Sequence, residues 1–176
     1  MPDLETSRIQ LREAAAEDLQ RLEPVLTSNA AFLQLTEGSA GEVGIYDLAR
    51  LQRDWTIAQL MPGRHIVGGY LKESGEPVAY LDYLEENDDG FPWVGTLISH
   101  TRHQRQGLGS EILCALAEYG QATYGWTSVR AGVLQTNTPA FAFALHLGFH
   151  SVGETEQTSP VGKTVAIILE RSLNPL

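Results

Sequence analysis

Basic and imidazole side chains gather in one short stretch of an otherwise acidic chain. The segment His100 to Gly109 reads HTRHQRQGLG and leads into an apolar run with helical spacing. Gly107 and Gly109 have no Cβ, which suits a backbone that turns sharply or approaches a ligand closely. The free amides at a helix N-terminus bind phosphate groups, and arginine adds bidentate contacts. The stretch therefore predicts a pyrophosphate-binding loop at the start of a helix.

Two common phosphate-binding motifs do not match this loop. A Walker loop needs a lysine followed by serine or threonine after its last glycine, and this loop has no lysine. A dinucleotide-binding fingerprint needs a third glycine where this chain has Ile112. The two glycines alone are also compatible with a simple strand-to-helix turn.

The elements that must position the loop follow from hydrophobic periodicity. Period-two patterns and turn residues predict strands near 7–14, 64–74, 76–87, 91–99, 127–135, 149–157 and 163–172. Helical spacing predicts helices near 15–26, 45–61, 106–123 and 138–147, the last with Thr138 as N-cap and Gly148 as the C-terminal glycine. We therefore expect one domain over residues 1–176, of mixed α/β class. Its mostly antiparallel central sheet would have about seven strands flanked by about four helices.

The wider pattern resembles the GCN5-related N-acetyltransferase (GNAT) superfamily. Residues Gln104 to Gly109 are similar to its Gln/Arg-x-x-Gly-x-Gly/Ala signature. Residues Asn137 to Phe149, NTPAFAFALHLGF, are similar to its second motif, Asn-x-x-Ala-x-x-Phe-Tyr-x-x-x-Gly-Phe. The resemblance is close from Pro92 to Phe149, and the order of elements agrees over the whole chain.

The resemblance implies that acetyl-CoA binds where the strand ending at Ser99 diverges from the strand Ser128 to Leu134. Backbone groups of the first strand would pair with the pantetheine arm, and the loop amides would hold the pyrophosphate. The cofactor-binding residues expected on this basis are Leu97, Ile98, Ser99, Gln104, Arg105, Gln106, Gly107, Leu108, Gly109, Ser110, Asn137, Ala140 and Phe143.

The expected catalytic residues depart from the family pattern. A tyrosine that protonates the leaving thiolate often follows the motif's Phe, but this chain has Ala144 there. General acid catalysis contributes typically about 10²–10⁴-fold, so its loss need not abolish the reaction. On the substrate side we expect Asp82 and Tyr80, which share one face of a strand because they lie two residues apart.

Charge and composition exclude some classes of binding partner. A formal charge of −10 argues against nucleic-acid binding and permits attraction of a cationic amine, although acidic balance also serves solubility. No apolar run is long enough to span a bilayer, the N-terminus lacks signal-peptide features, and Cys114 is the single cysteine. We therefore expect a cytoplasmic protein without membrane partners. No cluster has metal-ligand spacing, so no metal is expected.

The resemblance to the GNAT superfamily implies an acetyl-CoA-dependent N-acetyltransferase that transfers the acetyl group directly to a primary amine, without a covalent enzyme intermediate. A small cationic acceptor would bind between residues 26–61 and the strand residues near 80–86, attracted by the carboxylates Glu37, Glu42, Asp47 and Asp82. A protein N-terminus or a lysine is left open as the acceptor. The alternative is a non-catalytic CoA-binding sensor or scaffold, which Ala144 favours. A third reading is an unrelated nucleotide-binding domain, and a homodimer is left open.

Overall fold

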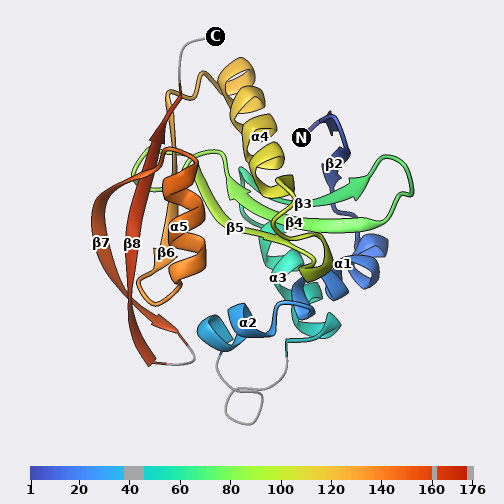
Figure 1. Ribbon diagram of the computed structural model, residues 1–176, viewed down its shortest axis with the longest axis horizontal. Helices are drawn as coiled ribbons and strands as arrows, with labels where there is room; N and C mark the ends of the chain where they lie inside the picture. Colours follow the sequence, from blue (N-terminus) through green and yellow to red (C-terminus); the bar gives the residue numbers. More distant parts are fainter. Residues whose placement is uncertain (38–45, 160–161, 174–176) are drawn as a thin grey trace.

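The central feature of the computed structural model, which describes residues 1–37, 46–159 and 162–173, is a mixed sheet. In that part of the chain the sheet has eight strands in the order β1-β2-β3-β4-β5-β6-β8-β7 (Figure 1). The strands are β1 (Leu4–Glu5), β2 (Ile9–Glu13), β3 (Arg64–Leu71), β4 (Pro77–Leu84), β5 (Trp93–Ser99), β6 (Ser128–Leu134), β7 (His150–Ser159) and β8 (Gly162–Ser172). The α-helices are α1 (Leu19–Thr27), α2 (Ala30–Glu37), α3 (Leu48–Gln59), α4 (Leu108–Tyr124) and α5 (Thr138–His146).

The mixed α/β fold predicted from the sequence is confirmed, with two additional elements. The short strand β1 pairs with β2 at the edge of the sheet, and helix α2 follows directly after α1. Both are short, so neither gives a periodic pattern long enough to stand out in the sequence. None of the helices in the described part of the chain combines the length and the apolar character needed to cross a membrane.

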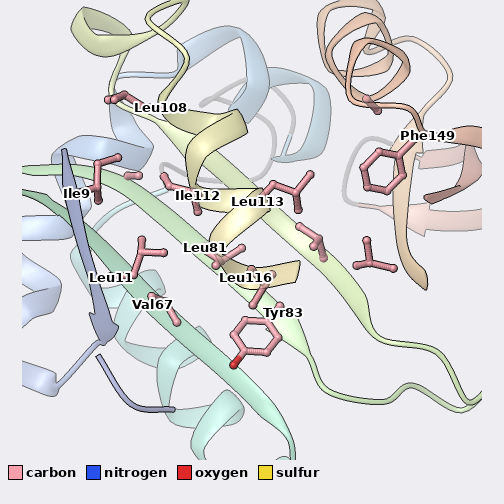
Figure 2. Close-up of a cluster of buried hydrophobic side chains, with 14 of the residues drawn as sticks. Ile9, Leu11, Val67, Leu81, Tyr83, Leu108, Ile112, Leu113, Leu116 and Phe149 are labelled. Atoms are coloured by element: carbon pink, nitrogen blue, oxygen red, sulfur yellow. The ribbon is translucent and has the colours of Figure 1, made fainter. Parts of the chain in front are cut away.

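Helices α4 and α5 cover one face of the sheet. The predicted apolar stripe of α4 is buried, with Ile112 and Leu116 at 0% and 1% exposed. These side chains lie over Leu81 and Tyr83 of β4, whereas Phe149, after α5, stands to one side of them (Figure 2). Full burial of one such side chain stabilises the fold by about 1.5–3 kcal/mol, so this cluster fixes α4 and the loop before it.

Helices α1 and α3 pack on the opposite face. Leu22 and Val25 of α1 and Leu51 of α3 are completely buried against Ile66 of β3 and Tyr80 of β4. Phe32 of α2 is partly buried against the same cluster. The two helical layers therefore enclose the sheet, and strand β5 lies between them.

A charged cluster on β2, β3 and the end of β4 ties three segments together. The His65 ring has Nδ1 3.0 Å from Glu13 and Nε2 2.7 Å from Glu85, and it stacks on Tyr83 with centroids 4.8 Å apart. Since both ring nitrogens face carboxylates, the imidazolium form suits the site best. The hydrogen bond with Glu13, against the opposing effect of burial, raises the pKa of His65 above its usual value, and Glu85 adds to the rise.

Candidate active site

The two central parallel strands separate and leave a cleft. Strands β5 and β6 are in register only at Trp93 with Arg130 and at Val94 with Ala131. Beyond these pairs the strands diverge around a cavity of about 310 Å³. Side chains from α2 on one side of the sheet and from α4 and α5 on the other line this cavity. The cleft therefore passes through the sheet from one helical layer to the other.

An irregularity on β5 marks the start of the cleft. Asp82 is in register with Thr96 and Tyr83 with Val94, so Gly95 is an extra residue that bulges from β5. A bulge bends its strand and increases the local twist. Gly95 lines the cleft, and the bulge helps to turn β5 away from β6.

The edge of β5 that faces the cleft offers backbone groups without a strand partner. The amide of His100 donates to the carbonyl of Val78 at 2.9 Å, and alternate residues of an antiparallel ladder make such bonds. Ile98, in register with Tyr80, therefore directs its amide and carbonyl to β4, and its side chain is buried. Leu97 directs its backbone groups to the cleft. Of these two predicted contacts, Leu97 is the better placed.

The loop after β5 presents a row of free amides. Helix α4 begins at Leu108, with Gly107 as its N-cap. Within the described residues, none of the loop and first-turn amides has a hydrogen-bond acceptor: those of Arg105, Gln106, Gly107, Leu108, Gly109 and Ser110. Such amides and the helix dipole form an anion site. The charge around this loop is positive, which suits an anion. Its effect is seen at His100: partial burial and then the charges of Arg102 and His103 hold the pKa of His100 below its usual value.

The two glycines of the loop serve different purposes. Gly107 has φ +83°, in the left-handed region, and a Cβ there would meet no atom closer than Arg8 Nη2 at 3.5 Å. Its requirement is conformational. A Cβ on Gly109 would lie 3.1 Å from Cζ of Phe143, tighter than most such contacts, so Gly109 lets α4 and α5 approach each other. Gly109 was predicted to allow a ligand to approach the backbone; the structure gives it a packing role, the close contact of α4 with α5.

The loop is braced from the N-terminal segment. Arg8 forms an ion pair with Glu111 at 2.6 Å and also donates to the carbonyl of Gln106 at 3.0 Å. Partial burial opposes ionisation of Glu111, but hydrogen bonds from Thr6, Arg8 and Ser7 outweigh it and lower the pKa of Glu111 to about 2. The carboxylate at the first turn of α4 is therefore ionised, and its negative charge is offset by Arg8.

Gln104 braces the loop from the other side. Its side-chain amide donates to Oδ1 of Asn29 at 2.6 Å and to the carbonyl of Ser99 at 3.2 Å. Asn29 also donates to that carbonyl at 3.1 Å. The Gln104 side chain was expected to contact the cofactor, and in this structure it holds the end of β5 to the helix pair α1–α2. The Arg105 side chain makes no such contact with the part of the chain that the structure describes, and Arg105 has φ 57°.

Helix α5 forms the opposite wall. Its N-cap is Asn137 rather than the predicted Thr138: the Asn137 Oδ1 accepts the amide of Ala140 at 3.2 Å. Asparagine is among the strongest N-caps, and it ranks above the threonine that follows it. Asn137, Ala140, Phe143 and Ala144 all line the cleft. Phe143 is 36% exposed, which leaves an aromatic surface open to a ligand.

The two expected catalytic residues lie beside the cleft, among partners. The Asp82 carboxylate accepts two bonds from the Arg64 guanidinium, at 3.1 and 2.7 Å, and Asp82 is 9% exposed. A Cβ on Gly95 would lie 3.8 Å from its Cγ, so only the bulge separates this pair from the cleft. Tyr80 is 4% exposed, and burial raises the pKa of its hydroxyl far above the usual value. Neither side chain lines the cavity.

The other carboxylates expected to attract a cation are placed differently. Asp47 is the N-cap of α3 and accepts the amide of Arg50 at 2.9 Å. Glu42 and the side chain of Glu37 lie outside the described residues. In the part of the chain that is described, no three His, Cys, Asp or Glu side chains are grouped so as to hold a metal ion.

Sequence reasoning missed the α2 side of the cleft wall, the bulge on β5 and an ion pair beside the cleft. Phe32 and Thr36 of α2 line the cleft, and the run of strong helix formers from Ala30 to Leu35 could have indicated that helix. Arg64, the partner of Asp82, had no local signal, because the two residues become diagonal neighbours only through the pairing of β3 with β4.

Comparison with solved structures finds proteins of the same fold. An acetyltransferase from Thermus thermophilus is 22% identical, with a TM-score of 0.75 over 98% of this chain and 100% of its own. An acetyl transferase from Salmonella typhimurium, described as modifying the N-terminal serine of ribosomal protein L7/L12, has a TM-score of 0.80 at 15% identity, over 98% of this chain and 100% of its own. A ribosomal L7/L12 α-N-protein acetyltransferase in complex with coenzyme A has a TM-score of 0.77 at 15% identity, over 98% of each chain.

At these identities the solved structures establish the fold alone. No curated protein matches the chain by sequence. The family model for the acetyltransferase (GNAT) family matches residues 30–149, which is more than half of the chain and includes both sequence motifs. The protein therefore belongs to the acetyltransferase (GNAT) family.

Proposed function

We propose that this protein is an acetyl-CoA-dependent N-acetyltransferase that transfers an acetyl group directly to a primary amine. The observation that carries the proposal is the placement of an amide loop and a cleft along one strand. The loop with six free amides follows β5 directly, and the cleft lies along the unpaired edge of β5 and opens between the two helical layers. Two substrates could therefore approach one another from opposite faces of the sheet.

The residues present fit the pyrophosphate and the pantetheine of CoA. The amides of Arg105 to Ser110 would bind the pyrophosphate, and the unpaired Arg105 side chain would add an ionic contact. The backbone of Leu97 would hold the pantetheine arm as a neighbouring strand would. Asn137, Ala140 and the exposed ring of Phe143 would close the opposite side.

Acetyl-CoA supplies an activated thioester, so the chain itself must orient the reactants and exclude water. The described lining of the cleft is largely apolar, with Thr36, Thr96 and Asn137 as its polar side chains and no titratable group. Backbone amides at the β5 bulge would polarise the thioester carbonyl. Asp82 and Tyr80 stay our substrate-side candidates; with both Asp82 oxygens bound to Arg64, a role in positioning fits better than direct proton transfer.

The acceptor class is the finer part of the proposal. The support for a small cationic amine is the negative charge of the chain and the carboxylates near the cleft. Of these carboxylates, Asp82 and Asp47 already have partners. A second candidate is the α-amino group of a protein. With a pKa of about 7.7–8.0 it is neutral in about one molecule in ten at pH 7, against fewer than about one in a thousand for a lysine. A cleft whose described lining holds no base favours the acceptor that is neutral already.

Thiol release from acetyl-CoA tests the proposal. The acceptors would be a short diamine, a peptide with a free α-amine and no lysine, and the same peptide with a formylated α-amine and one lysine. We expect amine-dependent thiol release, faster with the free α-amine than with the lysine peptide at neutral pH. If the diamine alone reacts, the small-molecule acceptor is correct.

The alternative function is a CoA-binding module without catalysis, which the alanine at position 144 favours. Acetyl-CoA would then bind and protect the fold against heat, but no amine would release its thiol. Stabilisation by acetyl-CoA without turnover on any acceptor would replace the proposed enzyme by this module.

A further inference from the structure

A second pocket lies at the other end of the same two strands. It has a volume of about 370 Å³ and is walled by the β4–β5 loop and by the end of α4 with the segment before β6. We call it the loop pocket and define it by Glu85, Glu86, Phe91, Tyr124, Trp126 and Ser128. It opens at the amino-terminal ends of β5 and β6, whereas the cleft opens at their carboxyl-terminal ends.

The lining of the loop pocket is negatively charged, because it contains two carboxylates and no basic side chain. Burial opposes the ionisation of Glu85, but the Tyr124 hydroxyl, at 2.6 Å, and His65 hold the pKa of Glu85 below its usual value. Glu86 is exposed and has no hydrogen bond or ion pair within the described residues. Glu85 is therefore anionic near neutral pH, and the Glu86 carboxylate has no described partner and is free to bind a cation.

Aromatic rings form the apolar part of the wall. The rings of Tyr124 and Trp126 stack with centroids 5.7 Å apart, and Phe91 lines the pocket from the β4–β5 loop. Aromatic faces attract ammonium groups and also accommodate an alkyl chain. Arg130, which stacks on Phe91, is paired with Asp89 and Glu170, so its positive charge is offset.

A hydroxyl without a protein partner lies at the wall of the pocket. Ser128 lines the pocket, the residue is 6% exposed, and its side chain makes no hydrogen bond with any described residue. Its oxygen is not among the buried polar atoms that lack a partner, so it is reached from the pocket, where a ligand or water can bond to it. A serine oxygen accepts a hydrogen bond from an ammonium group.

We propose that the loop pocket binds a small organic cation, namely a protonated primary amine on a short alkyl chain. The carboxylate of Glu86 and the second oxygen of Glu85 face the ammonium group, one ammonium N–H donates a hydrogen bond to the Ser128 hydroxyl, and the rings of Trp126, Tyr124 and Phe91 cover the alkyl chain. The site is separate from the acetyl-transfer cleft, and it stands whether or not the proposed function does.

The test uses n-butylammonium as the probe and 1-butanol as a neutral molecule of the same shape. The indole signal of Trp126 in a nitrogen-labelled NMR spectrum reports the loop pocket, and that of Trp55, which donates to Ala14 on α3's side of the sheet, is the internal reference. A cation bound only in the cleft would leave Trp126 unchanged. We expect a saturable shift of Trp126 with butylammonium and binding of butanol at least about tenfold weaker.

Matched variants assign the effect to the pocket. Glu86→Gln should lower the affinity for butylammonium about tenfold, since it removes the unpaired charge, and Ser128→Ala should lower it about threefold. Glu17→Gln removes the same charge from an exposed site outside the pocket and should leave binding unchanged. Equal binding of butanol, no saturable shift up to about 10 mM, or equal affinities in Glu86→Gln and Glu17→Gln would overturn the proposal.

Discussion

Replacing Gly107 with alanine separates the phosphate-binding role of the loop from its backbone conformation. Gly107 has φ +83°, and an added Cβ would meet only Arg8 Nη2, at 3.5 Å. The penalty is therefore conformational, about 1–2 kcal/mol for an L-residue in the left-handed region. At about 2–4 °C per kcal/mol for a domain of this size, the melting temperature should fall by several degrees.

The same substitution should weaken the binding of acetyl-CoA by more than its effect on stability suggests. To relieve the strain, the loop must rotate and turn at least one amide away from the ligand. A hydrogen bond to a charged group is worth about 1.5–3 kcal/mol, so the loss of one or two raises Kd about tenfold to hundredfold or more. Isothermal titration with acetyl-CoA measures this directly.

Gly75→Ala is the matched control. Gly75 has φ +67° in the β3–β4 turn, and no atom lies within 4 Å of an added Cβ. It should lose about the same stability as Gly107→Ala and keep the acetyl-CoA affinity of the parent protein. If Gly107→Ala loses stability but binds acetyl-CoA as the parent does, the amides at this turn do not hold the pyrophosphate. If it loses no stability, the conformational reasoning itself is wrong.

Three further predictions concern stability. His65 should make unfolding pH-dependent: its raised folded pKa gives stabilisation that is fully present below its unfolded value of about 6.5 and is lost as pH rises through the folded pKa. His65→Gln should flatten this part of the profile in urea titrations, and an unchanged slope would contradict it. Gly120→Ala should destabilise by about 1–3 kcal/mol or more, although alanine favours the helix, because its Cβ would lie 1.9 Å from Trp126; thermal unfolding no earlier than the parent's would refute this. Arg64→Met should cost about 2–4 kcal/mol by leaving the Asp82 carboxylate unpaired, and Asp82→Asn in the same chain should recover part of it in a double-mutant cycle.

The loop and helix α5 could be predicted because their signals are local. The strand, basic loop, glycines and helical stripe around residue 107 follow one another in the sequence, and so do the cap and terminal glycine of α5. Gly148 has φ +83°, as a residue that ends a helix requires. Local order of this kind also identified the family resemblance.

The contacts that hold the candidate site in place could not be predicted in this way. Arg8 and Glu111 are 103 positions apart, and the sequence between them does not determine their ion pair. The pair of Arg64 with Asp82 depends on the register of β3 and β4, and a shift by one residue would turn Asp82 to the other face. The contact between Gly109 and Phe143 depends on how closely two helices cross. These contacts are determined by tertiary packing and strand register, which a local sequence pattern does not contain.

The divergence of β5 from β6 also governs how the protein holds together. Strands β1 to β5 form one leaf and β6, β8 and β7 another, and two register pairs are the only ladder between them in the described chain. This seam should exchange its amide hydrogens before the interior of either leaf. A molecule bound along the open edge would bridge the leaves, and at a hundredfold excess over Kd it would add about 2.7 kcal/mol to the folded state. The protein's resistance to local opening would then follow the supply of its own substrate.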